Sequence, residues 1–89
     1  MSILYAASAG TMESSDAYIE IEPNVNGIEI QLDSVVEKQF GKAIRTSVEE
    51  VLKENGVASA RVRVVDRGAL DCVIRARVET AVLRGKGEA

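Results

Sequence analysis

The sequence has no histidine, one cysteine, one proline and only three aromatic residues among 89 positions. Histidine is the side chain whose ordinary pKa lies nearest neutrality, so its absence excludes a Ser-His-Asp triad, a Cys-His pair and any histidine-ligated metal site. The single thiol, Cys72, excludes an internal disulfide and a thiolate zinc site. We therefore expect no catalytic residue, no metal site and no enzymatic activity of the chain by itself.

Long apolar segments are also lacking. No run reaches the roughly eighteen apolar residues that a membrane-spanning helix needs. Residues 1–10 lack the basic start of a secretory signal, and a lone thiol suits a reducing compartment. These features predict a cytoplasmic protein.

Charge is unevenly distributed along the chain. Residues 1–55 hold ten acidic and four basic side chains, whereas residues 56–89 hold four acidic and seven basic ones. The basic set is Arg61, Arg63, Arg67, Arg75, Arg77, Arg84 and Lys86. Solvated or ion-paired arginines are the simplest interpretation, and local binding of a phosphate group is the alternative. Nucleic-acid binding is disfavoured, because the net charge is −3 and few aromatic side chains are available for base stacking.

The hydrophobic pattern predicts a single α+β domain over residues 1–89. Period-two alternation predicts three strands, and helical spacing of apolar residues predicts two helices that include Phe40 and Leu70 in their apolar stripes. The predicted strands are 17–22, 28–32 and 58–65, and the predicted helices are about 34–54 and 69–84. The element order is therefore β-β-α-β-α.

This order predicts a three-stranded mixed sheet with both helices packed on one face. The turn formers of residues 23–27 predict that the first two strands form an antiparallel hairpin. The crossover through the first helix predicts that the second and third strands run parallel. We expect the order 3-1-2, with the first strand in the centre and extra pairing from residues 2–6.

Ser34 has two interpretations. Ser34 and Glu37 match a capping box at the start of the first helix. Asp33-Ser34-Val35 also resembles the Asp-Ser-Leu of ordinary acyl carrier proteins, whose serine carries phosphopantetheine at a helix start. Those carriers are helical bundles, whereas this chain has three alternating strands. We therefore prefer the N-cap role.

Residues 7–16 have no periodicity and are predicted to form an exposed loop before the first strand. The segment contains four hydroxyl side chains, which belong to Ser8, Thr11, Ser14 and Ser15. No general base of suitable pKa accompanies them, so none is expected to be a self-activated nucleophile. A hydroxyl that another enzyme modifies fits a carrier or a phosphoacceptor better than a catalyst.

Three blocks of the sequence together carry a resemblance to a known family. The blocks are Ala9-Gly10-Thr11-Met12-Glu13-Ser14-Ser15-Asp16, Val36-Glu37-Lys38-Gln39-Phe40-Gly41 with Ala43-Ile44-Arg45, and Asp66-Arg67-Gly68-Ala69-Leu70-Asp71-Cys72-Val73-Ile74-Arg75-Ala76-Arg77. In order and spacing, through most of residues 9–83, they resemble the citrate lyase acyl carrier proteins, which are the gamma subunits of that enzyme. The related malonate decarboxylase acyl carrier subunit differs more in the third block and is the alternative.

The resemblance implies that Ser14 is modified. In this family the first serine of the motif carries 2'-(5''-phosphoribosyl)-3'-dephospho-CoA through a phosphodiester bond, attached by a prosthetic-group transferase. The arm's thiol carries acetyl, which the alpha (transferase) subunit exchanges for citryl; the beta (lyase) subunit then releases oxaloacetate. Ser15 is the neighbouring candidate. Glu13 and Asp16 serve either to guide the attaching enzyme or only to keep the loop solvated.

The remaining candidate residues have structural interpretations. Cys72 is interpreted as a small packing residue of the second helix. Asp66 and Asp71 flank a turn and a helix start, where acidic side chains are favourable. A small noncatalytic interaction module without a covalent group remains a further hypothesis.

Overall fold

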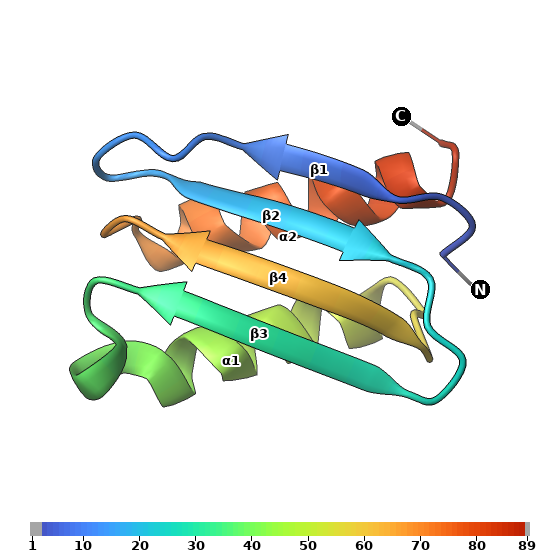
Figure 1. Cartoon of the computed structure of the whole chain (residues 1–89), viewed down its shortest axis with the longest axis horizontal. Helices are drawn as coiled ribbons and strands as arrows, with labels where there is room; N and C mark the ends of the chain where they lie inside the picture. The colour runs from blue at the N-terminus through green and yellow to red at the C-terminus, as the bar shows by residue number, and fades with distance from the viewer. Residues whose placement is uncertain (1–2, 89) are drawn as a thin grey trace.

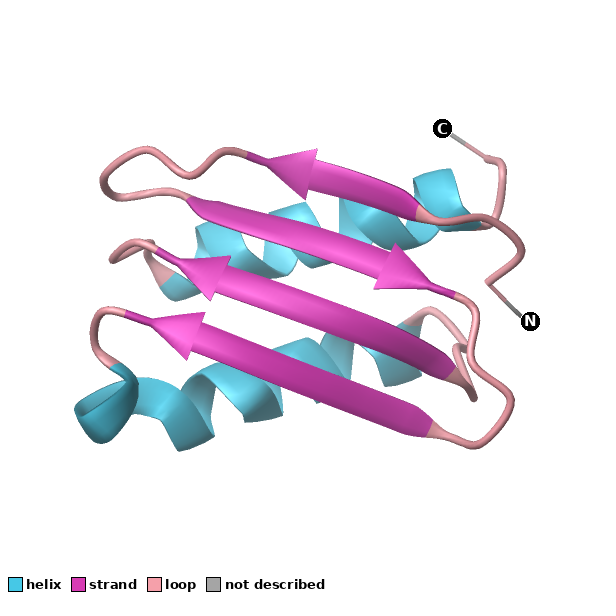
Figure 2. Cartoon of the chain, in the orientation of Figure 1, coloured by secondary structure: helices cyan, strands magenta, loops and turns pink. Residues whose placement is uncertain are grey.

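The computed structural model describes residues 3–88 and shows a mixed sheet with both helices on one of its faces (Figures 1 and 2). The elements are β1 (Ala7–Gly10), β2 (Ala17–Glu22), β3 (Ile28–Ser34), α1 (Glu37–Glu54), β4 (Ala60–Asp66) and α2 (Asp71–Gly85). The α+β class and the packing of both helices on one face agree with the sequence pattern. The sheet of the described part has four strands rather than the three predicted.

The strand order is β1-β2-β4-β3, which corrects the predicted order 3-1-2. β2 pairs antiparallel with β4, and β3 pairs parallel with β4, as the crossover through α1 predicted. The predicted hairpin between 17–22 and 28–32 is wrong, because β4 lies between those two strands. β4 takes this inner position because Ala60, Val62 and Val64 are fully buried and Val65 almost so. The short connection formed by residues 23–27 crosses the end of β4, so β3 pairs with the far side of β4 and not with β2.

β1 is the strand that the sequence pattern missed. Ala7–Gly10 pairs antiparallel with β2, with Ala9 opposite Ile19. The alternation of buried and exposed residues in this strand is hard to detect in the sequence because its side chains are small. Small side chains allow α2 to pack closely against the strand. The predicted loop of residues 7–16 is therefore shortened to 11–16. The extra pairing expected from residues 2–6 comes from Ala7–Gly10 instead; Ser2 lies outside the described residues.

The core fills the space between the inner sheet face and the two helices. Its largest fully buried apolar side chains are Ile19, Ile21, Val48, Leu52, Val62, Val64, Ile74, Val78 and Val82. Burying each such side chain contributes roughly 1.5–3 kcal/mol relative to leaving it exposed. The two largest exposed side chains of the predicted apolar stripes are Phe40, which is 47% exposed, and Leu70, which is 71% exposed.

Ser34 does not cap α1, which corrects the predicted capping box. Ser34 is the last residue of β3, α1 begins at Glu37, and Val36 occupies the N-cap position without a side-chain cap. The Ser34 hydroxyl donates to Asp66 Oδ2 at 2.7 Å and accepts from the Val36 N–H at 3.1 Å. The parallel register places Ser34 beside Asp66. The Ser34 hydroxyl therefore bonds to this carboxylate instead of capping the helix as the local sequence pattern predicted.

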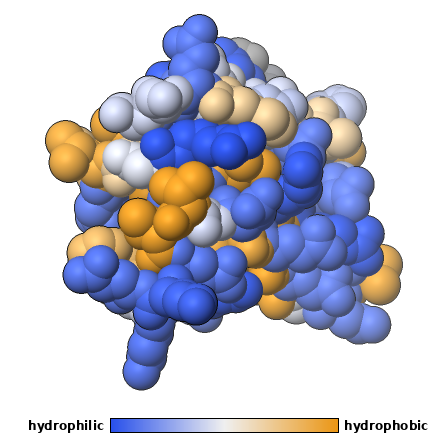
Figure 3. Space-filling model, turned by 60° about the vertical axis from the view of Figure 1, so that its left-hand side comes forward, coloured by the Kyte–Doolittle hydropathy of each residue, from blue (hydrophilic) through white to orange (hydrophobic). Residues whose placement is uncertain are grey.

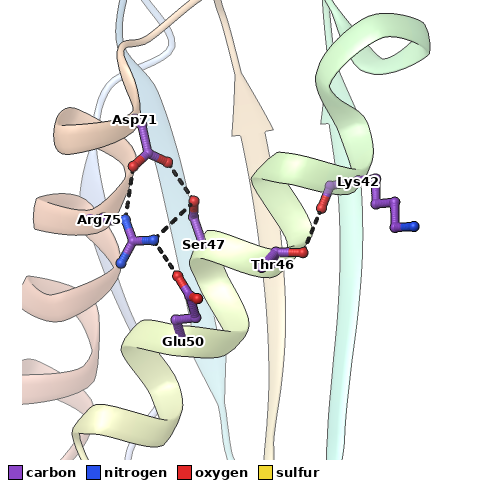
Figure 4. Close-up of polar contacts among 6 residues, drawn as sticks. All are labelled: Lys42, Thr46, Ser47, Glu50, Asp71 and Arg75. Atoms are coloured by element: carbon purple, nitrogen blue, oxygen red, sulfur yellow. Dashed lines mark hydrogen bonds and ion pairs between the residues drawn. The ribbon is translucent and has the colours of Figure 1, made fainter.

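A polar cluster joins the two helices (Figure 4). The Ser47 hydroxyl of α1, which is buried, donates to Asp71 at the start of α2. Arg75 pairs with Asp71 at 2.8 Å and with Glu50 of α1. The Ser47 hydroxyl, followed by the Arg75 guanidinium, holds the pKa of Asp71 below its usual value. The cluster confirms a structural role for Asp71 and fixes α2 against α1.

Ser47→Ala should lower the free energy of unfolding by about 1 kcal/mol, because a buried hydroxyl and its hydrogen bond to Asp71 are lost. Thr46→Ala is the matched control: the Thr46 hydroxyl is exposed and donates only to the Lys42 carbonyl within the same helix, so its loss should change stability by less than about 0.5 kcal/mol. Urea unfolding curves of the three proteins test this difference, and equal effects of the two substitutions would contradict it.

Candidate functional site

Residues 11–16 connect β1 to β2 at the left end of the sheet in Figure 1, where β3 and β4 end and both helices begin. This loop lies against the turn that follows β4. The Ser15 N–H donates to the Arg67 carbonyl at 2.9 Å, and the Arg67 N–H donates to the Asp16 carbonyl at 2.9 Å. The two segments therefore extend the β2–β4 ladder beyond its last paired residues.

Asp16 fixes the loop through its side chain, which is only 15% exposed. Arg77 of α2 holds the carboxylate with two hydrogen bonds, from Nε to Oδ1 and from Nη2 to Oδ2, both at 3.1 Å. The Thr11 hydroxyl donates to Oδ2 at 2.6 Å, and the Ala17 N–H donates to Oδ1 at 2.7 Å. We call this arrangement the Asp16 clamp. It ties both ends of the loop to α2.

The electrostatics of the clamp follow from these four donors. Hydrogen bonds to a carboxylate stabilise its charged form. The Thr11 hydroxyl, then the Arg77 guanidinium and the Ala17 N–H, lower the pKa of Asp16 to about 2. Asp16 is thus ionised at every pH at which the protein is expected to work, and the clamp stays closed there.

The backbone of the loop reverses at two unusual positions. Gly10 has φ of +94°, and a Cβ at this position would lie 1.9 Å from the Ala17 carbonyl oxygen. This position therefore requires glycine. Ser15 has φ of +65°, which is uncommon for a residue other than glycine. Its N–H bond to Arg67 holds the chain in this conformation.

Ser14 lies in the turn between these constraints. Its side chain is exposed, and its hydroxyl has no hydrogen-bond partner among residues 3–88. The Asp16 N–H donates to the Glu13 carbonyl at 3.2 Å and closes the turn around it. The exposure predicted for residues 7–16 is confirmed for residues 11–15. The hydroxyl is presented on a fixed backbone without an adjacent base, which suits modification by another protein.

The other hydroxyls of residues 7–16 are placed differently. Thr11 donates to Asp16 and also accepts from the Glu13 N–H at 3.2 Å, so its hydroxyl serves the clamp. Ser8 is a half-buried residue of β1. Ser15 is exposed like Ser14. The structure therefore brings only Ser14 and Ser15 to the exposed turn.

Cys72 and Asp66 complete the candidates. Cys72 is exposed, so the interpretation as a packing residue is wrong: helical geometry turns this position away from the buried face of Ile74, Val78 and Val82. Asp66 is 1% exposed and accepts hydrogen bonds from Ser34 and from the N–H groups of the β4–α2 turn. Its structural role is confirmed.

Most of the basic residues of the C-terminal part have acidic or carbonyl partners. Arg61 pairs with Glu22 and Glu29, Arg63 with Glu20, Arg75 with Glu50 and Asp71, and Arg77 with Asp16. Arg84 donates to the Ser8 carbonyl and Lys86 to the Asn55 carbonyl. This confirms the simplest interpretation for these residues. Arg67 differs, since its exposed side chain has no partner among residues 3–88.

Apolar side chains are exposed around the same end of the molecule. They are Met12 in the loop, Val35 before α1, Phe40 in the first turns of α1, and Leu70 before α2. Figure 3, which turns this end toward the viewer, shows separate hydrophobic patches within a hydrophilic surface. Within residues 3–88 no three acidic or cysteine side chains group together as metal ligands, and neither helix is long and apolar enough to cross a membrane.

Asp16→Asn should lower the melting temperature at pH 7 and flatten its acid dependence. The folded pKa of about 2 lies below the ordinary value of 3.8, so the wild-type carboxylate stabilises the fold above about pH 4. This contribution is lost as the pH falls from about 4 through 2. Thermal melts between pH 2 and pH 7 measure the effect.

Glu13→Gln is the matched control for this substitution. Glu13 is an exposed carboxylate of the same loop and has no ion pair among residues 3–88. Its substitution should leave the melting temperature at pH 7 unchanged. An Asp16→Asn variant as stable as wild type at pH 7, or one with the same acid dependence, would show that the clamp contributes nothing.

Comparison with known proteins matches nearly the whole chain. A family model described as the malonate decarboxylase delta subunit (MdcD) matches residues 5–85. The chain is 53% identical to the citrate lyase acyl carrier protein of Latilactobacillus sakei, covering 99% of this chain and 87% of that protein. It is 56% identical to the citrate lyase acyl carrier protein of Vibrio cholerae, covering 94% and 87%.

A solved structure shares the fold. The chain superimposes with a TM-score of 0.80 on a chain of a Pseudomonas malonate decarboxylase hetero-tetramer in complex with malonate. The match covers 92% of this chain and 84% of that one, at 22% sequence identity. At this level of identity the likeness concerns the arrangement of the strands and helices.

Proposed function

We propose that Ser14 carries a covalent prosthetic group, because this chain belongs to the citrate lyase acyl carrier protein family. Proteins of this kind are carriers and not catalysts. The observation that supports Ser14 is its exposed hydroxyl, which has no partner among residues 3–88. It lies on a turn held at both sides by backbone hydrogen bonds and the Asp16 clamp. Attachment there breaks no hydrogen bond of the fold.

The residues around Ser14 fit an attached phosphodiester. The Ser14 side chain is exposed, so an attached group would not have to enter buried space. The nearby Asp16 carboxylate is already paired with Arg77. No base among residues 3–88 is hydrogen-bonded to the Ser14 hydroxyl. Attachment therefore needs a separate prosthetic-group transferase that removes the hydroxyl proton.

We infer that the group is 2'-(5''-phosphoribosyl)-3'-dephospho-CoA and that the partners are the alpha and beta subunits of citrate lyase. When bound, the arm supplies thioester chemistry, holding the acetyl and citryl groups during citrate cleavage to acetate and oxaloacetate. The contribution of this chain is positional: the Asp16 clamp fixes the point of attachment, and tethering raises the local concentration of the thioester to about the millimolar range. A cytoplasmic location is consistent with such partners.

The acyl carrier subunit of malonate decarboxylase is the second candidate. It is favoured by the name of the matching family model and by the shared fold of the Pseudomonas chain. The identities of 53% and 56% with citrate lyase acyl carrier proteins favour the first candidate. Adding the loaded protein to carrier-free alpha and beta subunits of citrate lyase discriminates the two: we expect restored citrate cleavage.

The attachment residue is tested by co-expressing the chain with the transferase and measuring intact masses. Wild type and Ser15→Ala should gain the mass of the arm, whereas Ser14→Ala should not. Cleavage after Glu13 and Glu20 isolates residues 14–20, and fragmentation of this peptide separates Ser14 from Ser15 and excludes Ser34.

Both alanine variants should melt within about 1 °C of wild type, because both side chains are exposed. An unmodified wild-type protein under these conditions would refute the carrier function. A modified Ser14→Ala protein, or a bare Ser15→Ala protein, would move the attachment to Ser15. A bare protein that still forms a stable complex would favour a noncatalytic interaction module.

A further inference from the structure

We propose that Arg67 binds the phosphate group esterified to Ser14 and holds the first charged part of the attached arm against the protein. This inference rests on the proposed function of Ser14. It assigns a ligand of the phosphate-ester class to a side chain that has no polar partner among residues 3–88.

The first observation is the pairing of the basic residues. Of the seven basic side chains in residues 56–89, Arg67 is the one without a partner within residues 3–88. The others are used in ion pairs across the outer sheet face, in the polar cluster between the helices, in the Asp16 clamp, or in bonds to main-chain carbonyls. An unpaired, exposed guanidinium is therefore free to bind a ligand.

The second observation is the place of Arg67. Its N–H and its carbonyl both bond to the loop that carries Ser14, the first to Asp16 and the second to Ser15, each at 2.9 Å. These bonds fix the backbone of Arg67 beside the attachment turn. The long side chain of an arginine at this position can reach an ester oxygen on the neighbouring Ser14.

The third observation is the charge around Ser14. Attaching a phosphodiester adds a negative charge next to the exposed Glu13 carboxylate, which has no ion pair among residues 3–88. Arg77 cannot offset that charge, because both of its hydrogen bonds go to Asp16. Asp66 adds a further buried carboxylate at this end of β4. A cation is therefore needed here, and the planar fork of a guanidinium matches phosphate oxygens.

The test uses the full chain with phosphoserine built in at position 14, so that it does not depend on enzymatic attachment of the arm. The second ionisation of phosphoserine occurs near pH 6 and is followed by phosphorus NMR. Arg67→Gln should raise that pKa by about 0.5 at low ionic strength, and added salt should shrink the difference. Because Arg67 has no partner, the variant should melt like wild type.

Lys53→Gln is the matched control. It removes the same charge from the last turn of α1, at the opposite end of the molecule (Figure 1), and should leave the phosphoserine pKa unchanged. An unchanged pKa in Arg67→Gln, or an equal rise in Lys53→Gln, would overturn the inference. Such a result would not refute the carrier function, because that function is tested separately by the mass of the peptide that contains Ser14.

Discussion

The ion pair between Asp16 and Arg77 is the interaction on which the rest of the site depends. It joins a residue at the start of β2 to one in the middle of α2, 61 positions away in the sequence. The same carboxylate takes the Thr11 hydroxyl and the Ala17 N–H. This one carboxylate thus sets where the loop leaves β1, where it enters β2 and how both lie against the helix.

A carrier needs an attachment point that is exposed yet fixed, and these demands usually conflict in a loop. Here the conflict is resolved by dividing the tasks among neighbouring residues. Gly10 and Ser15 adopt the positive φ angles that reverse the chain, Thr11 and Asp16 hold the two flanks, and Ser14 keeps a free hydroxyl. Among residues 3–88 no base is hydrogen-bonded to that hydroxyl, so under the proposed function a separate enzyme supplies the attachment chemistry.

Several features of the fold could be predicted from the sequence because they depend on local periodicity. The strand at 17–22 and both helices are of this kind, and the parallel pairing of β3 with β4 follows from the helix that connects them. The missed features depend on contacts between distant segments. β1 was hidden by its small side chains, the central place of β4 follows from its burial, and Ser34 bonds to Asp66 across the sheet.

The candidate site shows the same division. The exposed hydroxyl segment and its resemblance to carrier proteins are visible in the sequence, which also names Ser14. Nothing in the sequence shows that Arg77, among seven basic residues, holds Asp16, or that Arg67 is left unpaired.

We expect the turn that carries Ser14 to be rigid before any group is attached. Nitrogen-15 relaxation of the unmodified protein measures this rigidity directly. This expectation corresponds to backbone order parameters of about 0.85 for Ser15, Asp16 and Arg67, equal to those of the inner strands. Values below about 0.6 at these residues would contradict it, because the hydrogen bonds that fix Ser14 would then not persist in solution.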